Sequence, residues 1–259
     1  QDKTKVELGQ GVGADIVNYA FNTIYNCFAR TAAFSPNGAD TKIRFRLAEY
    51  DPNGRKMEEK GINRYSLSTS DLNNLNPEKI KNNPKICWDY KRYLNIWIVE
   101  NMGNSVSTPH YILNTADLNQ IQGVSFEQLS LEEIEKQEYS LTDIGLIYGA
   151  RDFAIEDVGY PTQMGKFFGL LDTENQKEDY CEDTFAYNTY KEPWNTALEG
   201  SNSRLKISTD GLIFYSVNIM DASSYKNTIS MDQVKRIRTI TDNCPHRWAW
   251  KSDWAFTGK

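Results

Sequence analysis

The stretch "YPTQMGKFFGLLDTENQKEDYCEDT", residues 160–184, is the most informative segment of this chain. Its first half carries apolar residues at helical spacing and has a glycine, Gly169, where a helix would end. Its second half is acidic and contains Cys181. The pattern predicts a helix over 157–170, followed by a long polar excursion over 172–210.

The composition limits the classes of partner. The chain has 259 residues, with 29 Lys and Arg against 35 Asp and Glu, so its net charge is -6. An acidic chain with no basic run is a poor partner for nucleic acid or for an anionic membrane surface. No apolar stretch approaches the ~20 residues that span a bilayer. Because no repeat or linker divides the chain, we expect one α/β domain with long loops.

Other segments give clear periodicities. Residues 11–31 predict a helix with one apolar face, made of Ile16, Ala20, Ile24, Cys27 and Phe28. "TKIRFRLA", residues 41–48, alternates apolar and polar side chains, which predicts a strand with its apolar residues, Ile43, Phe45 and Leu47, pointing inward.

The later segments complete the predicted elements. "YLNIWIVEN", residues 93–101, is typical of a buried central strand, and "DIGLIYGA", residues 143–150, is a second strand. Residues 66–87 and 101–120 read as irregular connections. Residues 231–242 predict a helix in which Ser230 is the cap and Gln233 its capping-box partner.

Cysteine and histidine limit the metal chemistry. The four cysteines are isolated, which fits either buried free thiols or two long-range disulfides. The two histidines, His110 and His246, are too few for a three-histidine metal site. We expect both to be ordinary surface or hydrogen-bonded residues.

Residues 160–184 have the frame of a zinc-peptidase helix. Metzincin peptidases carry H-E-x-x-H-x-x-G-x-x-H, in which the histidines bind zinc and the glutamate is the base for the metal-bound water. When this motif is laid on the chain, only the glycine is kept. The motif positions are, in order, Thr162, Gln163, Lys166, Gly169 and Asp172.

The rest of the chain resembles the pappalysin family of metzincins, especially its secreted bacterial members. The similar segments are "KIRFRLAEYDPNG", "GINRY", "CWDYKRYLNIWIVEN", "GNSVSTP", "DIGLIYGA", "DYCEDT", "VNIMDASSYKNTISMDQVKRIR" and "NCP". The resemblance implies a metzincin-like α/β (α+β) fold with a twisted mixed sheet, an active-site-type helix, a Met-turn at Met220 and a C-terminal helix. It also implies one peptidase domain over 1–259, with subdomains of about 1–171 and 172–259.

The substituted positions predict that the zinc chemistry is lost. Threonine is a poor zinc ligand, protonated lysine repels the ion, and the amide of Gln163 cannot act as a general base. We therefore expect no zinc, and we expect Met220 to be a packing residue. One hypothesis is that Lys166 pairs with Asp172 as a buried substitute for the metal charge. The alternative is that both side chains point to solvent.

The resemblance also implies features outside the motif. A Cys181–Cys244 disulfide is expected, with Cys27–Cys87 as the leftover pair, and such bridges need an oxidising compartment. The protein is then exported to the periplasm or cell surface, after a signal or lipoprotein leader is removed before Gln1. Calcium is the one possible cofactor, with Asp179, Asp183 and Thr184 as candidate ligands in an acidic stretch that includes Glu174. A solvated acidic loop is the alternative.

Three functions follow from this reading. The first is a catalytically inactive metallopeptidase homologue whose cleft binds a peptide or protein segment along the edge strand 143–150. The second is an active zinc peptidase with a rebuilt site. The third is a structural or surface-interaction protein that docks a partner through its aromatic tail, which carries Trp248, Trp250 and Trp254. That tail can equally pack against the protein's own core. None of these functions has nucleic acid as a partner, and a membrane is a partner only if the protein carries a lipid anchor.

Overall fold

The structure is a computed structural model of the whole chain. It describes residues 5–7, 13–32, 38–68, 70–71, 74–100, 102–153, 159–173, 178–187, 205–221 and 226–252. Of the predicted features, Glu174, Trp254 and residues 157–158 lie outside these ranges. No helix in the described ranges has the length and apolar character needed to cross a membrane.

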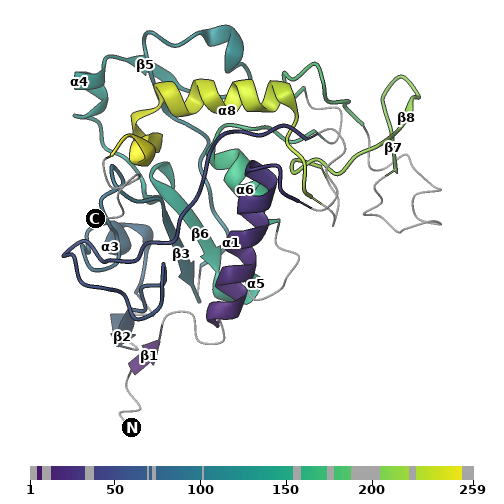
Figure 1. Ribbon diagram of the computed structural model, residues 1–259. Helices are drawn as coiled ribbons and strands as arrows, with labels where there is room; N and C mark the ends of the chain where they lie inside the picture. The colour runs from purple at the N-terminus through teal and green to yellow at the C-terminus, as the bar shows by residue number, and fades with distance from the viewer. Residues whose placement is uncertain are drawn as a thin grey trace.

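The centre of the fold is a parallel pair of strands. β3 (Asn95–Val99) pairs with β6 (Gly145–Gly149), so that Asn95 lies opposite Gly145 and Val99 opposite Gly149. All five residues of β6 are buried. Two helices, α1 (Ala14–Phe28) and α6 (Tyr160–Phe167), pack on each other, and α6 also packs on β6 (Figure 1).

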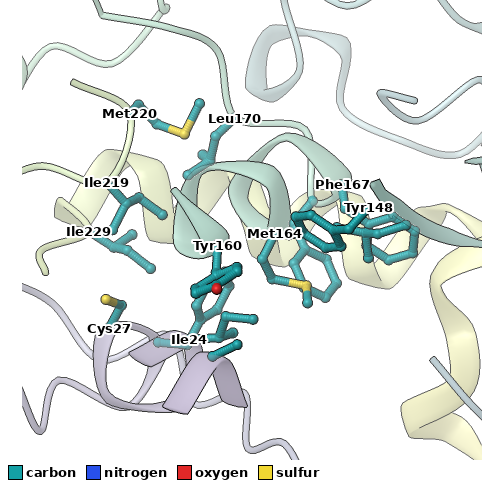
Figure 2. Close-up of a cluster of buried hydrophobic side chains, with 14 of the residues drawn as sticks. Ile24, Cys27, Tyr148, Tyr160, Met164, Phe167, Leu170, Ile219, Met220 and Ile229 are labelled. Atoms are coloured by element: carbon teal, nitrogen blue, oxygen red, sulfur yellow. The ribbon is translucent and has the colours of Figure 1, made fainter. Parts of the chain in front are cut away.

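The largest apolar cluster lies between these helices and the sheet. The face of α1 that contributes to it contains Ala20, Ile24, Cys27 and Phe28, as the helical periodicity predicted. The helix ends at Phe28, three residues earlier than the predicted end at residue 31. Figure 2 shows α6 at the centre of the cluster, with Tyr160 and Met164 projecting from it.

The predicted edge strand over 143–150 is confirmed in part: among the described strands β6 pairs with β3 alone, but its second edge is not open to a peptide at Ile147. β3 occupies one edge of β6, and Ser105 forms an antiparallel bridge with Ile147 on the other edge. Two backbone hydrogen bonds of 2.9 Å join these two residues. The segment around Ser105 therefore lies outside β6 on this side. It is exposed itself, and it covers β6, whose apolar residues are all buried.

The predicted strand over 41–48 is wrong. Its backbone is extended, and Ile43 and Phe45 pack against the core cluster as the alternation predicted. Within the described residues, however, β3 pairs with β6 alone, so 41–48 has no neighbouring strand with which to form a ladder. An alternating sequence specifies which side chains face inward, but a strand also needs a partner.

Short elements surround the central pair. Three small sheets pair β1 (Lys5–Glu7) with β2 (Ser66–Ser68), β4 (Tyr111–Leu113) with β5 (Glu127–Leu129), and β7 (Leu205–Ile207) with β8 (Ile213–Tyr215). Short helices are α3 (Pro77–Lys81), η1 (Leu118–Gln120), α4 (Leu131–Ile134), η2 (Leu141–Asp143) and α5 (Ala150–Phe153). Residues 66–87 and 101–120 are thus less irregular than predicted.

The C-terminal elements follow the sequence prediction closely. α8 (Met231–Asn243) begins at Ser230, and the capping box between Ser230 and Gln233 is present. After α8 the chain continues in η4 (Pro245–Lys251), where the indole nitrogen of Trp250 donates to the carbonyl of Thr241 at 3.2 Å. In the described residues, the aromatic tail therefore packs against the protein itself.

Candidate functional site

The end of α6 brings the motif positions together. Gly169 has φ +83°, a left-handed conformation that L side chains rarely adopt. Its N–H donates to the Lys166 carbonyl, and the N–H of Leu170 donates to the Gly165 carbonyl, each at 2.9 Å. These two bonds form a Schellman motif, which reverses the chain after the helix. The reversal carries Asp172 back toward Lys166.

Lys166 and Asp172 form an ion pair. The lysine Nζ lies 3.0 Å from Oδ1 and 3.1 Å from Oδ2 of the carboxylate. The side chains are 32% and 27% exposed, so the pair is half-buried and not buried as the hypothesis required. Water screens part of the attraction, and its contribution to stability is nearer to that of a surface pair, ~1 kcal/mol or less.

Thr162, at the first motif position, is committed to hydrogen bonds. Its Oγ1 donates to the Ile219 carbonyl at 2.5 Å and accepts from Lys226 Nζ at 3.0 Å. Lys226 follows the Met-turn in sequence and had not been identified as a site residue, because its position gives no helical or motif signal. Ammonium groups therefore contact the side chains at two of the three positions where the metzincin motif has histidines, and Gln163 lies half-buried on α6.

Met220 lies beneath α6 as part of the core. Its side chain is 1% exposed, and a Cβ added at Gly165 would come within 2.8 Å of its sulfur. Figure 2 shows Met220 beside Leu170 and Ile219. The turn is fixed to α8, because the Asn218 amide donates to Gln233 Oε1 at 2.8 Å and Gln233 Nε2 donates back to Asn218 Oδ1 at 3.1 Å.

These residues do not fit a zinc ion. Of the three ligand positions, Thr162 uses its hydroxyl within the protein and Lys166 presents a positive charge. Asp172 is the single anionic group, and it is paired with that lysine. Among the residues that the structure describes, no group of three or more His, Cys, Asp and Glu side chains is arranged to hold a metal.

Two buried arginines, which the sequence did not point out, fix the helix end. Arg247 Nε donates to the Phe167 carbonyl at 2.8 Å, and its guanidinium carbon lies 3.6 Å from the Phe167 ring centroid. Arg236 Nε donates to the Gly169 carbonyl at 2.6 Å. Burial lowers the pKa of both guanidinium groups. No sequence pattern separates such arginines from exposed ones.

The expected disulfides are absent from the structure, and all four cysteines are free thiols. Asp183, two residues after Cys181, accepts from the Ser230 hydroxyl at 2.6 Å and from the Asp232 N–H at 2.9 Å at the start of α8. Cys244 follows the other end of that helix. A helix of this length spans about 20 Å, whereas a disulfide needs Cα atoms within about 7 Å.

The other predicted pair, Cys27 and Cys87, is separated as well. Cys27 packs in the large core cluster, and Cys87 packs in a second cluster around Trp97 and Ile80. Burial raises the pKa of Cys27 to about 12 and that of Cys87 to about 11. Both are therefore thiols at neutral pH. The free thiols therefore give no indication of an oxidising compartment.

The candidate calcium ligands take part in hydrogen bonds within the protein. Asp179 accepts from the Thr184 hydroxyl at 2.6 Å and from the Cys181 N–H at 3.2 Å. Desolvation by burial raises the pKa of Asp179. Asp183 caps α8 as described above. The described part of the acidic stretch thus shapes a turn and fastens it to a helix.

The two histidines lie beside β4. His246 is 4% exposed and packs against the rings of Tyr90, Tyr111 and Tyr139, with centroids 5.4 to 5.8 Å away. Burial lowers its pKa to about 4. His110 is exposed. Its ring centroid lies 4.5 Å from that of Tyr111, one of the three tyrosines that surround His246.

Comparisons by sequence find no match among protein-family models or curated proteins. Comparison of the structure finds mirolysin. Mature mirolysin of Tannerella forsythia in complex with a cleaved peptide matches with a TM-score of 0.54 and 15% identity, over 95% of this chain and 91% of that one. Mirolysin in complex with a compound matches with a TM-score of 0.55 and 16% identity, over 96% and 92%. A promirolysin mutant of the same organism matches with a TM-score of 0.50 and 15% identity, over 93% and 79%.

The matches to the two mirolysin complexes extend over nearly the full length of both chains. The mixed α/β architecture of this chain is therefore the metzincin-like fold of mirolysin.

Proposed function

We propose that the protein is a non-catalytic homologue of metallopeptidases that binds a peptide. The observation that carries the proposal is the Lys166–Asp172 ion pair at two former ligand positions. A hydrolase of this fold needs a metal-activated water and a base, and Thr162, Gln163 and Lys166 supply neither. The fold resemblance to a metallopeptidase supports the scaffold, while function depends on the site.

We place the peptide on the outer edge of the sheet, along residues 102–108. Ser105 directs its N–H and carbonyl inward to Ile147, so the backbone groups of its neighbours, Asn104 and Val106, face away from β6. Gly103, Asn104 and Ser105 are exposed. An extended peptide can add to such an edge through main-chain hydrogen bonds. Mirolysin has been solved with a cleaved peptide, which supports peptide binding as the retained property.

Export to the periplasm or cell surface belongs to the same proposal and rests on the resemblance to secreted peptidases. Fractionation of producing cells checks it. Recovery of the protein in the cytosolic fraction would contradict export without affecting the peptide-binding proposal.

The test uses a mixture of unstructured peptides from digested casein. Hydrogen exchange should show slower exchange over 102–108 when peptide is bound, and mass spectrometry should show no new cleavage. Val106→Pro removes an outward N–H and should weaken binding at least tenfold. Val106→Ala keeps that N–H and is the matched control. Equal binding by the two variants, or zinc-dependent cleavage by the unmodified protein, would contradict the proposal.

A further inference from the structure

A second edge of the sheet borders a large apolar crevice. The crevice has a volume of about 870 Å³ and lies between the extended segment 41–50 and β3. Its floor is formed by α1 and α6, through side chains that include Val17, Ile24 and Met164. The size lies within the range of ligand-binding pockets in proteins, ~300–1,000 Å³.

The crevice faces the edges of two extended segments. All five residues of β3 line it, and so does every residue from Lys42 to Tyr50. In an extended chain successive side chains point to opposite faces, so a cavity over one face would be lined by alternate residues. Lining by consecutive residues on both sides means that the backbone edges border the cavity. Peptide N–H and carbonyl groups at such edges require hydrogen-bond partners.

The lining is positively charged although the chain is acidic. It contains seven basic residues and two acidic ones: Lys42, Arg44, Arg46, Arg64, Arg92, Arg238 and Arg247, against Glu49 and Asp242. Residues outside the lining pair with some of these charges: Asp40 with Arg44, Glu59 with Arg64, and Lys60 with Glu49. The net charge of the whole chain is -6. The charge of the crevice therefore favours an occupant with carboxylates.

An apolar side chain is also exposed at this edge. Ile96, in the middle of β3, is 40% exposed and lines the crevice. The N-terminal strand of the chain does not cover it, because Lys5–Glu7 pairs with Ser66–Ser68.

We propose that this crevice binds one extended segment of a partner polypeptide, with apolar and acidic residues in alternation. The segment adds to the edge of β3 that borders the crevice and runs beside 41–48, so that it pairs with both. Its apolar side chains face α1 and α6, and its carboxylates meet the basic lining. The site is on the opposite side of the sheet from 102–108, and the two sites are independent.

The probe is an acetylated hexapeptide of alternating glutamate and valine, with the lysine–valine hexapeptide for comparison. Binding of the glutamate peptide should slow hydrogen exchange over both 42–48 and 95–99, and the lysine peptide should bind at least tenfold more weakly. Ile96→Asp places a negative charge at an exposed position and should weaken glutamate-peptide binding at least tenfold. Ile213→Asp changes an isoleucine of β8 that is 51% exposed and outside the crevice, and should leave binding unchanged.

Several results would overturn the proposal. One is that the glutamate peptide does not bind, another is that it binds without slowing exchange over 42–48 and 95–99, and a third is that the two peptides bind with equal affinity. Slow exchange in the peptide-free protein would also overturn it. If that protection increases with protein concentration, a second copy fills the crevice, and if it disappears when residues 1–12 are deleted, the chain's own N-terminus does. Hydrogen exchange of Ile96→Asp with casein peptides separates this proposal from the one for 102–108, because the slower exchange over 102–108 should be unaffected.

Discussion

The ammonium of Lys166 lies 3.0 Å from the carboxylate of Asp172, and these residues stand at two of the three ligand positions of a metzincin motif. The Schellman turn at Gly169 produces this contact, and Arg236 and Arg247 hold the turn from two C-terminal elements. In the metzincin motif this turn brings metal ligands together. In this chain it brings two opposite charges together, a lysine and an aspartate, at positions where the motif has histidines.

If Met220 acts by packing alone, its size should matter more than its sulfur. Met220→Leu should lower the free energy of unfolding by less than about 1.5 kcal/mol, because the volume is conserved. Met220→Ala should lower it by about 2–5 kcal/mol, because a cavity is left beside Gly165. Urea denaturation measures both. Met231→Ala is the control, since Met231 is 57% exposed and should give little change. Equal values for Met220→Ala and Met231→Ala would contradict the packing role.

His246 should make the protein sensitive to acid. Its pKa falls from 6.5 to about 4 in the folded protein because of burial. The unfolded chain therefore binds the proton first, and stability decreases as the pH falls from about 6.5 toward about 4. His246→Phe should remove this part of the pH dependence in urea denaturation and keep the ring contacts. His110→Gln, at an exposed position, should retain it. A pH profile unchanged by His246→Phe would refute the assignment.

The cysteines should titrate as four thiols. In denaturant without reductant, a thiol-reactive disulfide reagent should modify four groups per chain. In the native protein the reaction should be slow, because burial raises the pKa of Cys27 and Cys181 to about 12 and suppresses the reactive thiolate. Finding two or fewer thiols in denaturant would restore the disulfide prediction.

The sequence was informative where interactions are local. The Ser230 capping box and the apolar face of α1 depend on residues within one or two turns, and both were predicted. The contact between Lys166 and Asp172 could also be anticipated, because a motif of fixed spacing relates the two positions.

Contacts between distant segments were not predictable in the same way. The alternation in 41–48 could not reveal that no described strand pairs with it, and the apolar run of β6 could not show that Ser105 bridges to its second edge. The hydrogen bond from Lys226 to Thr162 joins residues 64 positions apart. Tertiary packing determines such pairings, and a local sequence pattern carries no information about them.

The zinc content of the purified protein, after incubation with excess zinc and dialysis, tests whether the site at the end of α6 can hold a metal. The ion pair at Lys166 and Asp172 predicts no stoichiometric zinc. A variant that combines Thr162→His, Lys166→His and Asp172→His is the matched control, and it should retain one zinc per chain if the helix and turn still present a metzincin geometry. One zinc per chain in the unmodified protein would contradict the account, because it would mean that Asp172 and other side chains form a working metal site.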